Sequence, residues 1–274
     1  MKRYNRRSRL AVWTVLMALV VIAIYAAGLL IPESAIAAGF SNAKLSPCLA
    51  YPFGTDALGR DLFLQTIKGL SVSMTVGIVA SCVSAVIALL IGIAAAMGSR
   101  RVDGLINWII DLVMGVPHMV LILLISFAMG RGLKGLLIGI AATHWCSLAR
   151  LIRGEVMQLR SEQYVAVSRR LGKSSGWILT HHLLPHLVPQ FFVGLILMFP
   201  HAILHEAAVS FLGYGLPPEQ AAIGIILSES MKYISAGLWW PAVFPGAALL
   251  AVVLLIDRLG DNLKAILDPY SAQD

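Results

Sequence analysis

The feature that most constrains the fold of this chain is a series of long apolar runs. A helix rises about 1.5 Å per residue, so roughly 20 apolar residues are needed to cross the hydrocarbon core of a bilayer. Six segments qualify, although the fourth needs its flanks to reach across: Leu10–Ile31, Ser71–Met97, Ile106–Gly130, Leu133–Leu148, His186–Leu212 and Pro241–Gly260. We therefore expect an all-α integral membrane protein with about six transmembrane helices.

Composition excludes the main alternatives to a membrane protein. The chain is 58% hydrophobic and only 13% charged, with a mean hydropathy of +0.82, whereas ordinary soluble domains carry about 25% charged residues. The formal net charge of +7 could suggest nucleic acid, but the basic residues lie between apolar segments and form no stripe. We therefore expect a lipid membrane around this protein and no nucleic acid partner.

The distribution of basic residues predicts the orientation. With the N-terminus in the cytoplasm, 15 of the 21 Lys and Arg residues fall in cytoplasmic segments, in keeping with the positive-inside rule. This predicts a multi-pass membrane protein with both termini cytoplasmic. The predicted parts are a basic N-terminus (1–9), a first span (10–31), an extracytoplasmic loop (32–70), a five-helix core (71–260) that contains a cytoplasmic loop (149–185), and a cytoplasmic tail (261–274).

The first span could instead be a cleaved signal peptide. Five basic residues precede it, and Ala35-Ile36-Ala37 resembles a small-residue cleavage site. Signal peptides have an apolar core of about 7–15 residues, and this run is longer. We favour an uncleaved anchor.

A polar stretch, YVAVSRRLGKSSGWILTHHLLP (164–185), interrupts the apolar pattern on the predicted cytoplasmic side. Arg169 suits the last turn of a short helix, and Gly172 suits the left-handed cap after it. Ser174 or Ser175 can cap a second short helix, which should stop before Pro185. By local chemistry alone, this hairpin could simply lie in the headgroup region.

The same stretch resembles the "EAA" loop of ABC-importer permeases, whose short helices couple the spans to ATPase subunits. Ala166, Val167 and Ser168 stand where Glu-Ala-Ala is typical, whereas Gly172 and the closing Leu184-Pro185 match. The resemblance implies an ATPase-coupling role for the following residues: Tyr164, Ala166, Val167, Ser168, Arg169, Gly172, Leu184 and Pro185.

Three further stretches resemble the dipeptide/oligopeptide/nickel group of ABC-importer permeases. FGTDALGRD (53–61) is similar to its "GTDxxGRD" signature, EAAVSFLGYG (206–215) to its "EAxLSFLGxG", and GDNLK (260–264) with Asp268-Pro269 to its C-terminal "GDxLRDxLDP". In that group a permease pairs with a second, related permease as a heterodimer, with two ATPase subunits and an extracytoplasmic substrate-binding protein. The resemblance thus implies alternating access driven by ATP on the partner subunits.

The chain itself is not expected to be an enzyme or to bind a cofactor. Gly172-Lys173-Ser174 supplies only the end of a Walker A loop, and Val167 occupies the place of its first glycine. A membrane enzyme is disfavoured, because His201, His205 and Glu206 do not form H-E-x-x-H. A secondary transporter is disfavoured because no internal repeat is evident.

The cargo prediction rests on histidines. His201 and His205 lie i, i+4 on the fifth span with Glu206 beside them, and we place these three on the substrate path. Imidazoles at this spacing can bind nickel, zinc or copper, so His201 and His205 are candidate metal ligands, with further ligands expected from the partner or the cargo. Packing against a neighbouring helix is the competing interpretation.

Together with the degenerate coupling triplet, this pair favours nickel or a related metal species as cargo, with a dipeptide or oligopeptide as the alternative. The remaining histidines receive simpler interpretations. We expect His181, His182 and His186 to face solvent or headgroups. His118 and His144 are expected in interfacial belts at span ends.

Overall fold

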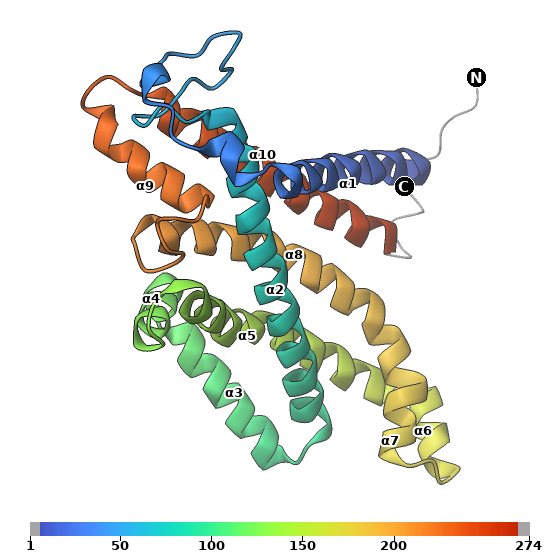
Figure 1. The fold of residues 1–274 in the computed structure, drawn as a ribbon. Coiled ribbons are helices and arrows are strands. Elements are labelled where there is room, and N and C mark those ends of the chain that lie inside the picture. Colours follow the sequence, from blue (N-terminus) through green and yellow to red (C-terminus); the bar gives the residue numbers. More distant parts are fainter. Residues whose placement is uncertain (1–5, 268–274) are drawn as a thin grey trace, which may run out of the picture.

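The computed structural model describes residues 6–267, and within them the chain is helical with only one isolated β-bridge, between Thr55 and Asp61 (Figure 1). The prediction of an all-α protein is confirmed. The α-helices are α1 (Arg6–Leu30), α2 (Leu62–Met97), α3 (Arg100–Gly115), α4 (His118–Ala128), α5 (Gly132–Ser161), α6 (Gln163–Arg170), α7 (Ser175–Ile178), α8 (Leu184–Phe211), α9 (Ile223–Ile234) and α10 (Trp240–Leu267). Two 3₁₀ turns, η1 (Glu33–Ile36) and η2 (Phe40–Asn42), follow α1, and a π-helical turn, η3 (Leu179–Leu183), joins α7 to α8.

Five helical segments are long and apolar enough to cross a membrane: Arg9–Leu30, Leu62–Met97, Gly132–Ser161, Ser175–Phe211 and Trp240–Leu267. The predicted span Ile106–Gly130 is broken instead, because α3 and α4 meet at an angle of 95°. The cause is local. Pro117 disfavours helical backbone in the residue before it, and Val116 is extended, with φ −93° and ψ 138°. Counting the bent pair as one span gives six.

Several predicted boundaries are shifted. The second helix begins at Leu62 rather than Ser71, because the Asp61 carboxylate accepts a hydrogen bond from Phe63 N at 2.8 Å and caps the helix. Helix α5 continues past Leu148 to Ser161, and α10 continues through the first part of the predicted tail to Leu267. Residues 1–5 and 268–274 of the predicted N-terminus and tail lie outside the described residues.

Helix α2 lies at the centre and packs against α1, α5 and α8 (Figure 1). Small buried residues such as Gly77, Ala80 and Ser84 allow this close approach between helices. An ion pair joins the first turn of α3 to α5: two nitrogens of the Arg153 guanidinium donate to the Asp103 carboxylate, at 2.5 and 2.7 Å. The start of α3 is therefore held against α5.

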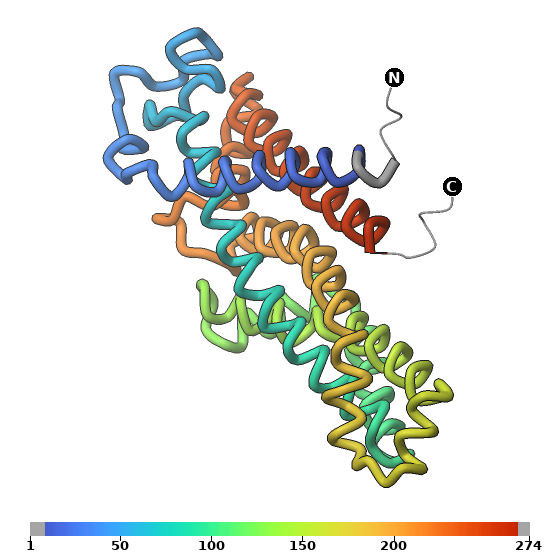
Figure 2. The backbone as a smooth tube through the Cα atoms, turned by 90° about the vertical axis from the view of Figure 1, so that its right-hand side faces the viewer, coloured from blue at the N-terminus to red at the C-terminus, as the bar shows by residue number. Residues whose placement is uncertain are grey.

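Helices α1 and α10 run side by side in opposite directions, so the two described ends of the chain lie close together (Figure 2). Only 6% of the apolar window of α1 is buried, so nearly all of this helix is left for lipid or another subunit. This peripheral position suits the predicted anchor.

Candidate functional site

Two regions carry the predicted functional residues, and the first is a projecting helical hairpin. We call α6, α7 and η3 with their connection, residues 163–183, the tip (Figure 1). Gly172 has φ +80°, and the Ser174 hydroxyl accepts a hydrogen bond from Trp177 N at 3.2 Å. The left-handed glycine and the serine cap are as the sequence predicts.

The end of the second tip helix is not as predicted. The chain does not stop before Pro185 but continues through η3 directly into α8, with Pro185 in the first turn. Pro185 lacks the N–H that would donate to the preceding turn, and the π-helical turn η3 lies directly before it, where the regular hydrogen-bond pattern is already interrupted. The tip is thereby a helical extension of α8.

The inner side of the tip is anchored to the spans. Val165, Ile178 and Leu183 are buried in one cluster with Ile152 and Val156 of α5. At the hairpin's centre, Ser168 Oγ lies 2.9 Å from His182 Nε2, and the His182 ring packs on Tyr164 at 5.3 Å between centroids. These contacts tie α6 to η3.

The outer side of the tip is exposed and unusually apolar for a surface. Val167 and Leu171 are 54% and 73% exposed. Of the predicted coupling residues, Tyr164, Ala166, Val167, Arg169, Gly172 and Pro185 are exposed, whereas Ser168 and Leu184 are half-buried. An exposed apolar patch rimmed by basic side chains is suited to binding another protein.

The second region is a cavity of about 610 Å³ beside the α3–α4 bend. Three imidazoles from three helices meet there: His118 begins α4, His144 lies in the middle of α5, and His205 lies on α8. Their ring centroids are 4.7 to 5.0 Å apart, and His118 Nε2 lies 3.3 Å from His144 Nδ1. We call His118, His144 and His205 the histidine cluster.

The interpretation of His118 and His144 as interfacial belt residues is wrong. His144 lies far from an end because α5 continues to Ser161, and the break at Pro117 turns His118 toward α5 and α8. A proline inside an apolar run was the available signal for the second of these features.

The three residues predicted on the substrate path do not all lie at the cavity. His201 lines the cavity with His205, as their shared helix face requires, but it does not belong to the histidine cluster. Glu206 does not line the cavity. It is fully buried on another face of α8, where its carboxylate accepts a hydrogen bond from Ser210 Oγ at 2.8 Å.

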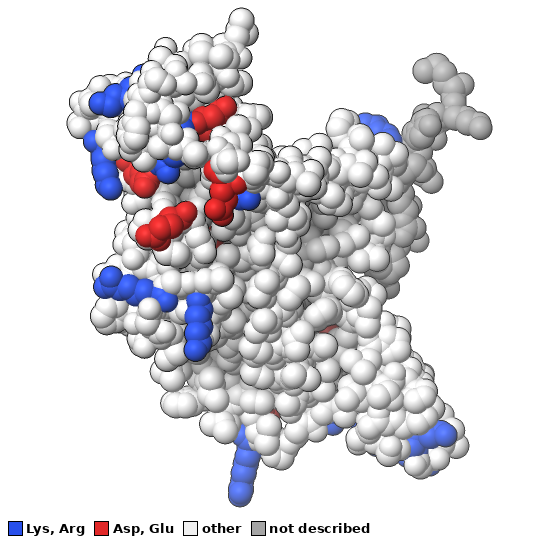
Figure 3. All heavy atoms as spheres, viewed as in Figure 1, with Lys and Arg blue, Asp and Glu red and all other residues white. Residues whose placement is uncertain are grey.

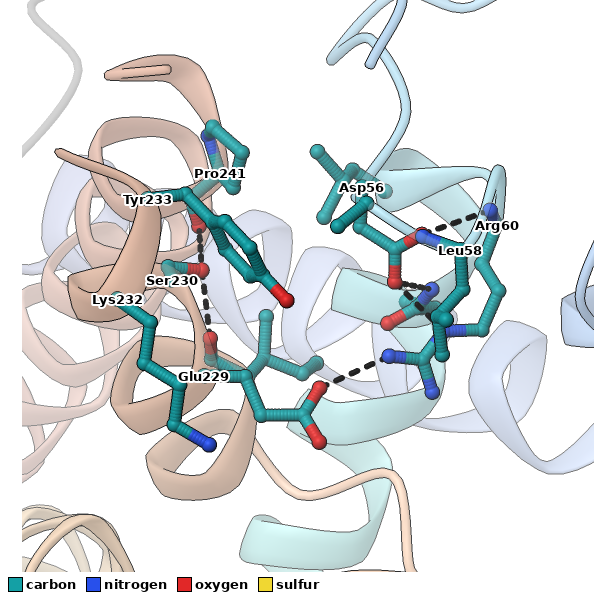
Figure 4. Close-up of a pocket in the computed structure, with 12 residues that line it drawn as sticks. Asp56, Leu58, Arg60, Glu229, Ser230, Lys232, Tyr233 and Pro241 are labelled. Atoms are coloured by element: carbon teal, nitrogen blue, oxygen red, sulfur yellow. Dashed lines mark hydrogen bonds and ion pairs between the residues drawn. The ribbon is translucent and has the colours of Figure 1, made fainter. Parts of the chain in front are cut away.

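A third polar region lies at the opposite end of the molecule from the tip (Figure 1). Arg60 binds Asp56 at 2.6 Å and Glu229 of α9 at 2.8 Å, across a small pocket between the loop before α2 and α9 (Figure 4). Burial alone would lower the pKa of the Arg60 guanidinium, but the two carboxylates raise it above its ordinary value. The cation is thus held in place.

The GTDxxGRD-like stretch builds this end of the molecule. The buried Thr55 hydroxyl donates to Asn42 O at 2.6 Å, and Trp240 Nε1 donates to Thr55 O at 3.1 Å. Helix α9, where Glu229 lies, falls between two of the predicted spans. The spacing of Ile223, Ile226 and Ile234 was the signal for it.

Charge separates these regions on the surface (Figure 3). On the face shown, acidic side chains gather almost entirely near the end that carries α9, where basic side chains lie among them, and the tip carries basic side chains. Apart from basic side chains that project on the left at mid-height, the zone between the two ends is largely uncharged. A largely uncharged zone between two charged ends is the surface pattern of a membrane protein.

An all-helical chain with five to six candidate spans belongs to the class of multi-pass membrane proteins. Residues 88–269 match the family described as binding-protein-dependent transport system inner membrane component. The chain belongs to this family and is a permease component of an ABC importer. Such a component implies ATPase and substrate-binding partners.

Three known proteins illustrate the relationship. A protein of Brucella suis, provisionally named a peptide transport system permease protein, is 35% identical over 98% of this chain and 90% of its own length. The dipeptide transport system permease protein DppC of Bacillus subtilis is 32% identical over 87% of this chain and 74% of its own. A chain of the MetNI methionine ABC transporter, solved in inward-facing conformations, has the same fold: its TM-score is 0.61 at 16% identity, over 76% of this chain and 98% of that chain.

Proposed function

We propose that this chain is one half of a heterodimeric permease in the inner membrane, with both termini and the tip on the cytoplasmic side. The observation that carries the coupling role is the two-sided tip. Its inner side is buried against α5 through Val165, and its outer side exposes Val167 and Leu171. A hairpin anchored in this way can pass a push from a docked ATPase subunit directly into α8, because η3 and α8 form one helical path.

We propose a short peptide as the cargo. The relatives named above include peptide and dipeptide permeases at 32–35% identity. This supports the alternative of the sequence analysis over its first choice of nickel. The cavity at the bend, at about 610 Å³, falls within the roughly 300–1,000 Å³ range of small-molecule sites.

A transition-metal ion or metal chelate is the second candidate cargo. One observation favours it, namely the histidine cluster in the wall of that cavity. Cargo in an importer of this kind is first selected by the binding protein, so the cluster supports this candidate without requiring it.

Uptake by cells with and without the complete transporter tests both candidates. We expect labelled dipeptide to accumulate only when the transporter is present, and Val167→Asp to abolish that accumulation while the protein still reaches the membrane. Uptake of labelled nickel without uptake of dipeptide would show that the cargo is the metal and not the peptide. Uptake of peptide that is indifferent to Val167→Asp would contradict the coupling role of the tip.

A further inference from the structure

The histidine cluster contains one buried imidazole nitrogen that has no hydrogen-bond partner among the described residues. His144 Nδ1 lies 3.1 Å from Ile140 O and 3.4 Å from Thr143 Oγ1, whereas His144 Nε2 is buried without a partner among the described residues. Buried polar atoms are nearly always paired, so an unpaired one calls for an explanation such as an absent ion. No carboxylate lines the cavity to supply one.

The spacing of the rings suits a shared ligand. One nitrogen from each ring can be chosen so that all three lie within 4.8 Å of one another. Metal–imidazole bonds of about 2.0–2.1 Å place two tetrahedral nitrogen ligands roughly 3.3 Å apart. The His118 Nε2 to His144 Nδ1 distance of 3.3 Å shows that these two rings already approach to this range. Because His144 Nδ1 faces Ile140 O at 3.1 Å, the unpaired Nε2 is the His144 atom left free to bind an ion.

The surrounding chemistry selects the kind of ion. The three ligand groups are imidazoles, and Met119 Sδ lies 2.8 Å from His205 Nδ1. Imidazole with a neighbouring thioether favours nickel, copper or zinc over magnesium or calcium, which prefer oxygen ligands. Three protein ligands beside a cavity also leave coordination positions open, as in sites that accept an exogenous ligand.

We propose that His118, His144 and His205 form a binding site for a divalent late first-row transition-metal ion, with its remaining coordination positions open to the cavity. The site goes beyond the proposed function, because it exists whether the cargo is a peptide or a metal species. It differs from the pair expected from the sequence, since His118 and His144 replace His201 and join His205.

The test measures Co²⁺ binding to the complete purified transporter in nanodiscs, carrying a purification tag without histidine. Bound metal per transporter would be counted after gel filtration for wild type and for His118→Ala, His144→Ala and His205→Ala. His186→Ala is the matched control, because it lies on α8 outside the cavity and is exposed. Comparison of variants removes any contribution from the other subunits.

We expect wild type and His186→Ala to bind one Co²⁺ more tightly than each cluster variant, by roughly 100-fold or more, since even groups that only orient metal ligands are worth 10–100-fold. Equal binding by wild type and the cluster variants would overturn the site. If a cluster variant fails to fold, the visible spectrum of Co²⁺ on the wild-type transporter decides: intense nitrogen-ligand bands of low coordination support the site, and a spectrum of hydrated Co²⁺ overturns it. Dipeptide uptake by the same preparations in proteoliposomes tests the permease function separately.

Discussion

The molecule contains two groups of three histidines, and they differ in a way that their positions in the sequence conceal. His181, His182 and His186 are close neighbours in the chain, and their rings pack on aromatic side chains: His181 stacks on Trp177 at 4.4 Å, and His182 and His186 lie 5.3 and 6.4 Å from Tyr164. The histidine cluster is drawn from α4, α5 and α8, far apart in the chain, and its rings meet within 5.0 Å.

The comparison indicates that a shared ligand site is formed by residues from separate helices that meet at one point. Neighbouring residues on one helix turn point in successive directions about 100° apart, so at most a few can face one point. Residues on separate helices are limited only by where those helices cross. His181, His182 and His186 therefore serve local packing, and the histidine cluster can serve a ligand.

The largest loss of stability is expected when a charged side chain is introduced on the buried, inner side of the tip. Val165→Asp places a carboxylate in a fully buried apolar site and should destabilise the attachment of the tip by roughly 3 kcal/mol or more. Thermal unfolding of the purified permease pair would measure it. Val167→Asp, on the exposed side, should leave that stability unchanged but reduce co-purification of the ATPase subunits. Equal loss of stability in both variants would show that the tip has no distinct inner and outer sides.

A smaller effect is expected at the turn of the tip. Gly172 has φ +80°, so Gly172→Val should cost about 1–2 kcal/mol in backbone strain. We expect ATP hydrolysis stimulated by the binding protein to fall several-fold, with Co²⁺ binding unchanged. Gly176→Val is the control: neither glycine has an atom within 4 Å of an added Cβ, but Gly176 has an ordinary φ. Matching losses in the two variants would argue against a requirement for the left-handed turn.

His182→Ala should have a still smaller effect. It removes the 2.9 Å hydrogen bond with Ser168, a loss of about 1 kcal/mol, and should lower stimulated ATP hydrolysis modestly. Metal binding should not change. A large drop in Co²⁺ binding by His182→Ala, measured as for the cavity variants, would place a metal at the tip and break the contrast between the two groups.

The smallest effect is expected from His201→Ala. His201 lines the cavity outside the histidine cluster, so Co²⁺ affinity should change by less than about threefold, the range of substitutions that make no direct contact. Titration of Co²⁺ with the purified transporter measures this change. A loss of Co²⁺ affinity as large as that of His205→Ala would instead support His201 and His205 as the metal ligands predicted from the sequence.

Much of the fold could be predicted because it depends on local pattern. The apolar runs locate α1, α2, α5, α8 and α10, since length and hydropathy alone decide membrane crossing. The turn at Gly172 and the cap at Ser174 were predictable for the same reason: each depends on residues within one turn. Helix α9 could also have been predicted, from the spacing of its apolar residues.

The histidine cluster could not be predicted, because it depends on how helices cross. The spacing of His201 and His205 is a helical property and was recognised, but their partners are chosen by packing. His118 reaches His144 only because α4 departs from α3 by 95°. A proline indicates that a break is present; it does not indicate the direction in which the next helix points.

Site-directed cross-linking of the tip tests the central claim most directly. In a chain with the exposed Cys48 and Cys82 replaced by Ser, Val167→Cys would be treated with a short cysteine-to-amine reagent in the complete transporter. Leu49→Cys, fully exposed at the opposite end, is the control. We predict a cross-link to the ATPase subunit from position 167 and none from position 49. A cross-link from position 49, or none from position 167 while the complex remains intact, would contradict the docking of the tip on the ATPase.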